Sequence, residues 1–357
     1  MEHLVDLDDI ELLKSRDPGH MLEALAGLPQ QCREGVKIAR EQEISFPRFT
    51  FNNVVVTGLG GSAIGGDFLR VYAGQKCRIP VAVNRDYRLP LFVGENTLVL
   101  AVSYSGNTEE TLAAYDEARN KGAALVALTS GGKLAEKAKN DGNPLITIPG
   151  GLQPRAATGY LFIPTLIILH KLGLVPDVSE GLDDMISTLE SVGRKNTPDM
   201  HQAKNPAKQL AKMFYNKIPV IWGVSGTTET AAMRWKGQIN ENSKALAYYN
   251  ILPELNHNEI VGTEVPEQLL KEIELVVLRS EDDHPRVQKR IEITKEIIGE
   301  RVSGFTEIWG EGKSLLARMF SLTYLGDYTS VYLALLYGID PSPVHLITQL
   351  KNKLVTA

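Results

Sequence analysis

Short, strongly apolar runs alternate with helical segments along the first half of this 357-residue chain. The runs are rich in Val, Leu and Ile, a pattern typical of strands that are buried on both faces. Between the third and fourth runs, residues 109–122 have helical spacing and end at Lys121-Gly122, a favoured helix stop. Strands that alternate with helices predict a parallel sheet covered on both faces, so the expected fold class is α/β. The five runs are residues 54–58, 81–84, 97–103, 124–129 and 145–148.

The alternation starts again in the second half of the chain, which predicts a second α/β domain. Three strand-like runs are followed by a long apolar helix at residues 313–337, and residues 226–230 open another helix. The runs are residues 218–225, 275–279 and 305–309. We therefore expect a helical N-terminal segment at 1–48, a first domain at 49–176, a helical connection at 177–213, and a second domain with C-terminal helices at 214–357.

Composition excludes several classes of function. The net charge is −5 and no basic run is present, so neither nucleic acid nor an anionic membrane is an expected partner. The most apolar stretch, residues 160–169, is broken by a proline and is shorter than the about 20 residues that span a bilayer. The N-terminus is acidic and lacks an apolar h-region, so no secretory signal is expected. Cys32 and Cys77 form no Cys-x-x-Cys pair, so we expect reduced thiols and a cytoplasmic protein. The seven histidines are scattered, so no metal site is expected.

A Ser- and Thr-rich loop follows the third predicted strand. It has the sequence Ser103-Tyr-Ser-Gly-Asn-Thr108 and opens a helix, and open α/β sheets bind ligands where a strand ends in this way. A helix N-terminus offers unpaired N–H groups and partial positive charge to an anion, and Ser103, Ser105 and Thr108 add hydroxyl donors. The loop therefore predicts a phosphate site in which Thr108 also caps the helix. An ordinary strand-turn-helix without a ligand remains an alternative.

A glycine-rich loop, Gly58-Leu-Gly-Gly-Ser-Ala-Ile-Gly-Gly-Asp67, follows the first predicted strand. A dinucleotide site would need an acidic residue at the end of the second strand, where this chain has Asn84-Arg85. No Gly-Lys-Ser/Thr follows the glycines, so the Walker pattern is absent as well. We interpret Gly60, Gly61 and Ser62 as backbone brought close to a small ligand, and expect no cofactor.

Candidate acid–base residues lie in two polar segments of the second half. Glu241 lies near the end of a helical pattern at residues 234–245, and His257 is flanked by Asn256 and Asn258, which could fix its ring. A carboxylate and an imidazole suit proton transfer on sugars, although a solvated glutamate and an exposed histidine are open alternatives.

Two basic residues are further candidates. Arg155 follows the fifth strand and could stabilise an oxyanion or form a surface ion pair. Lys351 is most simply a solvated helix lysine.

Five motifs together resemble a known family. The two loops described above resemble those of sugar isomerase (SIS) domains. The segments Pro154-Arg-Ala-Ala-Thr-Gly-Tyr160, Asn240-Glu-Asn-Ser-Lys244 and Glu254-Leu-Asn-His-Asn-Glu259 narrow the resemblance to the bifunctional phosphoglucose/phosphomannose isomerases. The resemblance runs from about residue 45 to the C-terminus. It implies two SIS domains, each with a five-stranded parallel sheet flanked by helices, in a homodimer with shared active sites.

The resemblance also implies roles for individual residues. The substrates would be hexose 6-phosphates, converted without a metal ion. Ser103, Ser105 and Thr108 would hold the phosphate, and Gly60, Gly61 and Ser62 would line the sugar. Glu241 is similar in position to the family's base, and His257 is similar in position to the ring-opening residue, which the partner subunit contributes. Arg155 is similar in position to the group that stabilises the intermediate. Lys351 is similar in position to a C-terminal active-site lysine.

Two other functions remain open at this point. A single-specificity glucose-6-phosphate isomerase would share the phosphate and base motifs, because these do not determine tolerance at C2. A non-catalytic sugar-phosphate sensor would need a DNA-binding module, and residues 1–48 show no basic recognition helix. Amino-sugar isomerisation would need an ammonia source, and the chain has no room for a glutaminase domain.

Overall fold

The computed structural model describes residues 5–46 and 50–355. The chain forms two compact units, which we name after their sheets. The first-sheet unit contains residues 27–190 and 312–318, and the second-sheet unit contains residues 1–26, 191–311 and 319–357. Two helices, α8 (Ser179–Asn196) and α13 (Leu315–Leu336), contribute residues to both units. The domain boundary expected at residues 48–49 falls outside the described residues.

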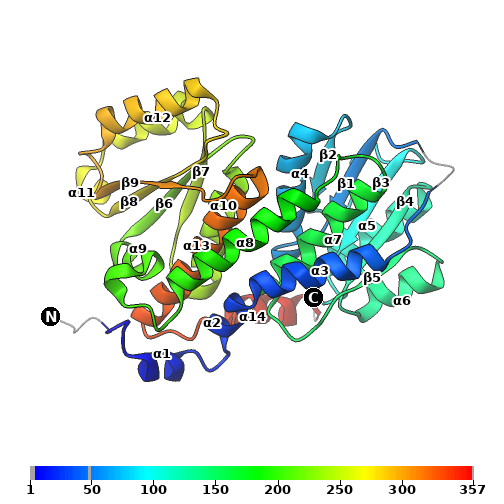
Figure 1. Cartoon of the computed structure of the whole chain (residues 1–357), viewed down its shortest axis with the longest axis horizontal. Coiled ribbons are helices and arrows are strands. Elements are labelled where there is room, and N and C mark those ends of the chain that lie inside the picture. Colours follow the sequence, from blue (N-terminus) through cyan, green and yellow to red (C-terminus); the bar gives the residue numbers. More distant parts are fainter. Residues whose placement is uncertain (1–4, 47–49, 356–357) are drawn as a thin grey trace. The chain divides into compact units, whose positions relative to one another are not determined.

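The first-sheet unit contains the five-stranded parallel sheet that the sequence predicts (Figure 1). The strand order is β2-β1-β3-β4-β5, so the connections reverse direction between β1 and β3. Such a switch point leaves a crevice at the carboxyl ends of the two strands, where doubly wound folds bind ligands. The strands are β1 (Asn53–Thr57), β2 (Val81–Asn84), β3 (Thr97–Val102), β4 (Ala124–Thr129) and β5 (Leu145–Thr147).

Helices cover the first sheet because its central strands, β1, β3 and β4, are largely apolar and buried. All six residues of β3 are buried, and Val99 belongs to a core cluster with Tyr115 of α5 and Leu134 of α6. Helices α3 and α7 pack against each other, and α4 packs against α7. The helices are α3 (Leu28–Glu41), α4 (Gly61–Lys76), α5 (Glu109–Asn120), α6 (Gly132–Asn140) and α7 (Thr158–Lys171), with a short 3₁₀ turn at Pro154–Ala156.

The second-sheet unit has a parallel sheet with four strands in the part of the chain described, where the expectation was five. Its strand order is β7-β6-β8-β9. The sequence pattern did not predict β7, because this edge strand has exposed Tyr248 and Tyr249 and its apolar run is interrupted by Asn250. The strands are β6 (Ile218–Val224), β7 (Tyr248–Leu252), β8 (Ile273–Arg279) and β9 (Gly304–Trp309).

The helices of the second-sheet unit surround a core with several large aromatic side chains, Trp222, Trp235 and Tyr328 among them. Trp235 of α10 donates from its indole nitrogen to the Leu322 carbonyl oxygen of α13 at 2.7 Å, which joins the two helices. The helices are α1 (Ile10–Arg16), α2 (Met21–Ala26), α9 (Pro206–Phe214), α10 (Glu229–Gln238), α11 (Glu267–Leu270), α12 (Pro285–Ile298) and α14 (His345–Val355).

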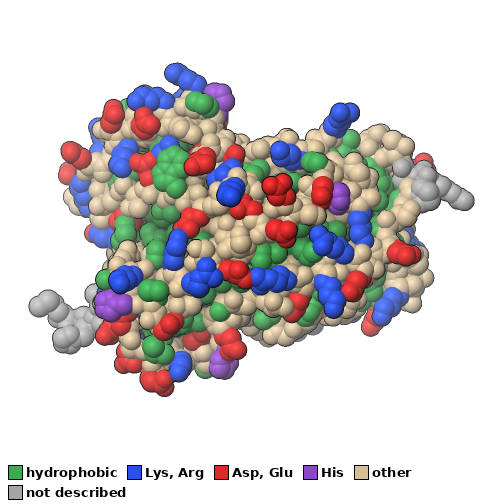
Figure 2. All heavy atoms as spheres, in the orientation of Figure 1, with side chains coloured by type: hydrophobic (Ala, Val, Ile, Leu, Met, Phe, Trp, Pro, Cys, Tyr) green, Lys and Arg blue, Asp and Glu red, His purple; other side chains and the backbone are tan. Residues whose placement is uncertain are grey.

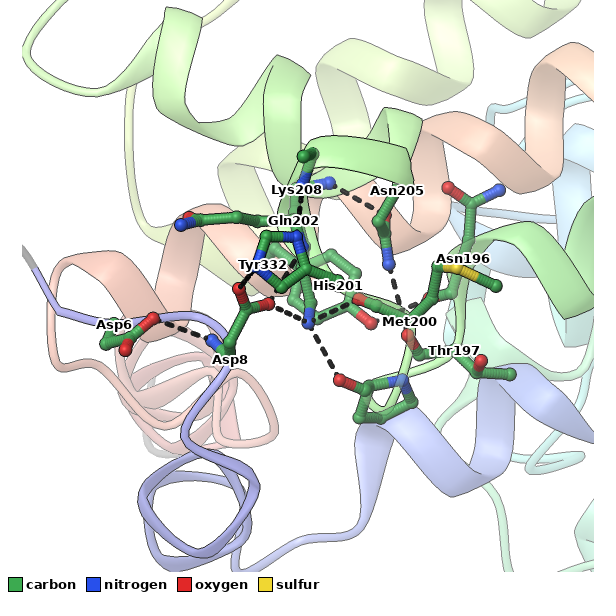
Figure 3. Close-up of polar contacts among 12 residues, drawn as sticks. Asp6, Asp8, Asn196, Thr197, Met200, His201, Gln202, Asn205, Lys208 and Tyr332 are labelled. Carbon is green, nitrogen blue, oxygen red and sulfur yellow. Dashed lines mark hydrogen bonds and ion pairs between the residues drawn. The ribbon is translucent and has the colours of Figure 1, made fainter.

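Within the second-sheet unit, a fully buried lysine joins Asp8, near the N-terminus, to the segment before α9 (Figure 3). The Lys208 ammonium donates to Asp8 Oδ1 at 3.1 Å and to the carbonyl oxygens of Pro198 and Met200 at 2.7 and 2.9 Å. Asp8 also accepts from the backbone N–H of Gln202 at 2.8 Å. Because three acceptors match the three ammonium protons, the buried charge is fully compensated.

Two further observations concern the surface and possible ligands. Among the described residues, no helix is long and apolar enough to cross a membrane, and no three His, Cys, Asp or Glu residues cluster as metal ligands. Figure 2 shows Lys and Arg side chains interspersed with Asp and Glu side chains over the face in view.

Candidate active site

The loops that follow β1 and β3 meet at the switch point of the first sheet. The hydroxyl of Ser62, at the start of α4, accepts a hydrogen bond from the backbone N–H of Tyr104 at 3.0 Å. Ser62 and Ser103 are both buried, whereas Ser105 is exposed. The structure therefore brings the glycine-rich loop and the Ser- and Thr-rich loop together, as the sequence predicts for a parallel sheet.

The Ser- and Thr-rich loop is organised by its own hydroxyl groups. The Ser103 hydroxyl accepts from the backbone N–H of Gly106 at 3.1 Å and lies 3.0 Å from the Thr108 hydroxyl. Thr108 is the N-cap residue of α5, but its side chain makes no capping hydrogen bond, so the predicted capping role is wrong. Its hydroxyl pairs with Ser103 instead, which leaves the N–H groups of the first turn of α5 without a side-chain cap from this residue.

Arg155 lies on the 3₁₀ turn at Pro154–Ala156, which contacts the glycine-rich loop. A β-carbon on Gly61 would lie 2.8 Å from the carbonyl carbon and oxygen of Pro154, so only glycine permits this approach. Arg155 is 3% exposed, and the alternative of a surface ion pair is therefore wrong. The first-sheet unit thus gathers Gly60, Gly61, Ser62, the Ser- and Thr-rich loop and the turn that carries Arg155.

Sequence reasoning missed the loop after β4, which supports the Ser- and Thr-rich loop. The backbone N–H of Lys133 donates to Asn107 Oδ1 at 3.1 Å, and the Leu134 N–H donates to the Gly106 carbonyl oxygen at 2.9 Å. The Ser130 hydroxyl donates to the carbonyl oxygen of Tyr104 at 2.6 Å. The sequence signal that could have found this loop is Thr129-Ser-Gly-Gly132, polar and glycine-rich residues between a buried strand and a helix.

The acid–base candidates lie in the second-sheet unit. Glu241 belongs to a π-helical turn, Ile239–Ser243, that directly follows α10. The expectation of one helix through residue 245 was wrong, because α10 ends at Gln238 and Lys244 adopts a left-handed conformation with φ +53°. Glu241 is half-buried.

His257 is the last residue of a 3₁₀ turn, Glu254–His257, and its side chain is exposed. The prediction that the neighbouring asparagines fix its ring was wrong. Asn256 donates to the Thr294 hydroxyl at 3.0 Å, and Asn258 donates to Glu254 Oε1 at 3.4 Å. Lys351 is an exposed residue of α14.

Comparison with known proteins identifies the family. Residues 51–148 match the model of the SIS domain, and residues 203–354 match the model of the bacterial phospho-glucose isomerase C-terminal SIS domain. The chain is 52% identical over 334 residues to the bifunctional phosphoglucose/phosphomannose isomerase of Caldicellulosiruptor bescii, which covers 94% of this chain and 98% of that protein. This chain belongs to the bifunctional phosphoglucose/phosphomannose isomerase family.

A second relative supports this assignment, and a solved structure shows the same fold. The bifunctional phosphoglucose/phosphomannose isomerase of Aquifex aeolicus is 40% identical, over 85% of this chain and 91% of that protein. The crystal structure of a glucose-6-phosphate isomerase like protein from Thermus thermophilus has a TM-score of 0.65 at 20% identity, and covers 96% of this chain and 100% of that chain. The structural likeness establishes the fold, and the sequence matches establish the family.

Membership of the phosphoglucose/phosphomannose isomerase family confirms the resemblance drawn from the five motifs. The roles of the individual residues remain predictions.

Proposed function

We propose that this protein interconverts glucose 6-phosphate and mannose 6-phosphate with fructose 6-phosphate through a cis-enediolate, without a metal ion or a cofactor. The observation that carries the proposal is the hydroxyl-lined loop Ser103–Thr108 at the switch point of the first sheet, joined to Ser62 and to the turn of Arg155. Relatives in this family, one of them 52% identical to this chain, bear the name of this activity.

In this proposal the sugar is anchored by its phosphate. Ser103, Ser105 and Thr108 donate hydroxyl protons to the phosphate oxygens, and the N-terminus of α5 adds backbone N–H groups and partial positive charge. Gly60, Gly61 and Ser62 line the sugar, because their backbone reaches the same edge of the sheet. Anchoring the phosphate fixes where C1 and C2 lie, and this positioning lowers the entropic cost of the proton transfer.

The reaction itself is a proton transfer between neighbouring carbons. His257 and Lys351 move the proton that opens the sugar ring. The Glu241 carboxylate then takes the proton from C2 of the aldose and returns it to C1, while the proton on the C2 hydroxyl moves to the C1 oxygen. Arg155 stabilises the negative oxygens of the enediolate, and losing such a contact costs a factor of about 10² to 10³ in rate.

Glucose 6-phosphate and mannose 6-phosphate differ only in configuration at C2, so one base can serve both. If the enediolate rotates about its C2–C3 bond, Glu241 reaches either face of C2, and one site produces both aldoses. A restricted rotation would give the alternative function, a single-specificity glucose-6-phosphate isomerase. A non-catalytic sensor would bind the sugar phosphate without turnover.

The substitution Glu241→Gln tests the assignment of the base. We expect Glu241→Gln to abolish isomerisation while fructose 6-phosphate still binds with nearly unchanged affinity in calorimetry, because the phosphate donors are intact. Glu296→Gln is a matched control, since Glu296 is an exposed glutamate of α12 in the same unit and has no assigned role. Substantial activity in Glu241→Gln would remove this residue as the base.

The proposal includes a homodimer in which His257 serves the active site of the partner subunit. Mixing Glu241→Gln and His257→Ala chains should then restore partial activity, because one site of each mixed dimer has both residues. No recovery after verified subunit exchange would contradict a shared site. We also propose a cytoplasmic location, which is supported by the two cysteines, Cys32 and Cys77, being free thiols.

A further inference from the structure

We propose that Arg234, Asp327 and Ser330 form a buried clamp that positions Glu241 for proton transfer. This inference rests on the proposed function, in which Glu241 is the base. The three residues are positioning residues, because they act on the turn that carries Glu241 and not on the sugar. All of them belong to the second-sheet unit, on α10 and α13.

The turn that carries Glu241 needs outside support. It is a π-helical turn of five residues, Ile239–Ser243, and π turns are rare, are less favourable than α-helix and occur frequently at functional sites. Lys244 ends the turn in the left-handed region, with φ +53°, where a side chain is strained. Such a turn persists only where surrounding contacts determine it.

Ser330 of α13 supplies two of these contacts. The residue directly after Glu241, Asn242, donates from its side-chain amide to the Ser330 hydroxyl at 2.9 Å. The next residue, Ser243, donates from its hydroxyl to the Ser330 carbonyl oxygen at 2.6 Å. Asn242 and Ser243 are 0% and 1% exposed, so neither hydrogen bond can be replaced by water without rearrangement.

Asp327 lies one turn before Ser330 on α13 and holds the end of α10. Arg234 donates to both of its carboxylate oxygens, from Nε at 2.9 Å and from Nη2 at 2.8 Å. Gln238, the last residue before the π turn, donates to Asp327 Oδ1 at 2.9 Å. The Ser330 hydroxyl donates in turn to the Asp327 carbonyl oxygen at 2.7 Å, which links the two anchors.

The four-residue spacing of the contacting residues shows that they lie on one face of α10 and of the π turn that follows it. Arg234, Gln238 and Asn242 follow one another at intervals of four residues, and all three are directed to Asp327 or Ser330. A buried ion pair adds little net stability, because desolvation offsets the attraction. A two-bond Arg–carboxylate fork does fix geometry, however, which is what a base on an irregular turn requires.

Lys244 anchors the C-terminal end of the π turn. The Lys244 ammonium donates to the carbonyl oxygens of Asn242, Asp340 and Pro341 at 3.0, 2.9 and 2.8 Å. The turn is therefore anchored before, beside and after Glu241, whereas Glu241 itself is only half-buried. These contacts hold the backbone on both sides of Glu241.

The variant Ser330→Ala tests the clamp, because it removes the acceptor of Asn242 and leaves Glu241 unchanged. Thr329→Val is the matched control, since it removes a neighbouring α13 hydroxyl that donates to Leu325 of its own helix. The readouts are kcat and KM for glucose 6-phosphate and the primary isotope effect with substrate deuterated at C2. A displacement of about 1 Å can cost a factor of about 10² in rate, so we expect kcat to fall by about tenfold to a hundredfold in Ser330→Ala. KM should stay within about twofold, and the isotope effect on kcat should rise.

A purely structural role for the clamp would give a different result. Loss of folded protein lowers the active fraction but leaves the isotope effect of the remaining active molecules unchanged. An unchanged isotope effect and kcat per folded molecule in Ser330→Ala would overturn the clamp. If Ser330→Ala yields no soluble protein, Arg234→Lys provides the same test, because it keeps the charge and loses the two-bond fork. Activity in Glu241→Gln would instead refute the proposed base, so the two failures are distinguishable.

Discussion

Gly132, the first residue of α6, packs directly against Ser105 in the loop after β3. A β-carbon on Gly132 would lie 2.5 Å from the Ser105 carbonyl oxygen and 2.9 Å from both side-chain amide atoms of Asn107. The Ser- and Thr-rich loop is therefore contacted by both neighbouring loops of the first-sheet unit. Ser62 contacts it from the loop after β1, and Gly132 contacts it from the loop after β4.

The variant Gly132→Ala should weaken sugar-phosphate binding. The added methyl group displaces Ser105, and alanine is strained at the φ of +68° that Gly132 adopts. We expect KM for fructose 6-phosphate to rise by at least about tenfold, since displacement by about 1 Å can cost about 10². Steady-state kinetics measure the change in KM that follows from displacing Ser105, and the melting temperature measures the loss of stability that follows from the strained backbone.

Gly142→Ala is the control that separates backbone strain from displacement of the loop. Gly142 has nearly the same φ, +69°, but a β-carbon there would meet nothing within 4 Å. This variant should lose stability of about 1 kcal/mol and keep the KM of the parent protein. Equal changes in KM for the two variants would contradict the supporting role of the loop after β4.

The variant Ser62→Ala should loosen the connection between the loops after β1 and β3. It leaves the backbone N–H of Tyr104 unpaired in a buried position, which costs about 1–3 kcal/mol. We expect a lower melting temperature and a higher Kd for fructose 6-phosphate, both measured by calorimetry. Ser187→Ala, which removes an exposed hydroxyl bonded to Asp184 of the same helix, should change neither quantity. An unchanged Kd in Ser62→Ala would show that the connection is dispensable for binding.

The variant Asp8→Asn should reduce stability in a pH-dependent way. Burial opposes ionisation of Asp8, but hydrogen bonds from Lys208 and the Gln202 backbone, with the nearby charges of Lys208 and His201, lower the pKa of Asp8 overall. A carboxyl whose pKa is lowered in the folded state stabilises the protein above its unfolded pKa of about 3.9, and this contribution is lost as the pH falls through the folded pKa. At pH 7 the loss in Asp8→Asn should be about 3 kcal/mol, because the charge of Lys208 stays buried.

Urea unfolding from pH 7 down to pH 3 measures this effect. The difference between the parent protein and Asp8→Asn should shrink at the acidic end of that range. Glu11→Gln is a control on the same N-terminal segment, since its ion pair with Lys14 is exposed on both sides. A difference that stays constant with pH would contradict the lowered pKa of Asp8.

The sequence predicts the first sheet well because its three central strands, β1, β3 and β4, are buried almost throughout. Runs such as Val54–Val56 or Leu98–Val102 have no polar face, so composition alone marks them. The edge strand β7 lacks this signal, because exposed Tyr248 and Tyr249 do not form a continuous buried run. The half-exposed edge strands β2 and β5 were still predicted, because their residues are mainly Val, Leu and Ile, so what β7 lacks is a run of aliphatic residues.

The candidate site likewise contains one part that the sequence predicts and one part that it does not. Ser103, Ser105 and Thr108 lie in one loop, and a parallel sheet brings that loop to Ser62 without further information. The π turn at Glu241 was not predictable, because it depends on Asp327 and Ser330, about 90 residues away in sequence and on another helix. The local sequence pattern around Glu241 does not indicate hydrogen bonds to residues so distant in the sequence.

The most direct test follows purified protein with fructose 6-phosphate by NMR in the presence of EDTA. We predict that glucose 6-phosphate and mannose 6-phosphate both form, that EDTA does not slow their formation, and that Glu241→Gln forms neither. Formation of glucose 6-phosphate alone would establish a single-specificity isomerase. Formation of no aldose phosphate by the intact protein, with fructose 6-phosphate still bound, would contradict the proposed function.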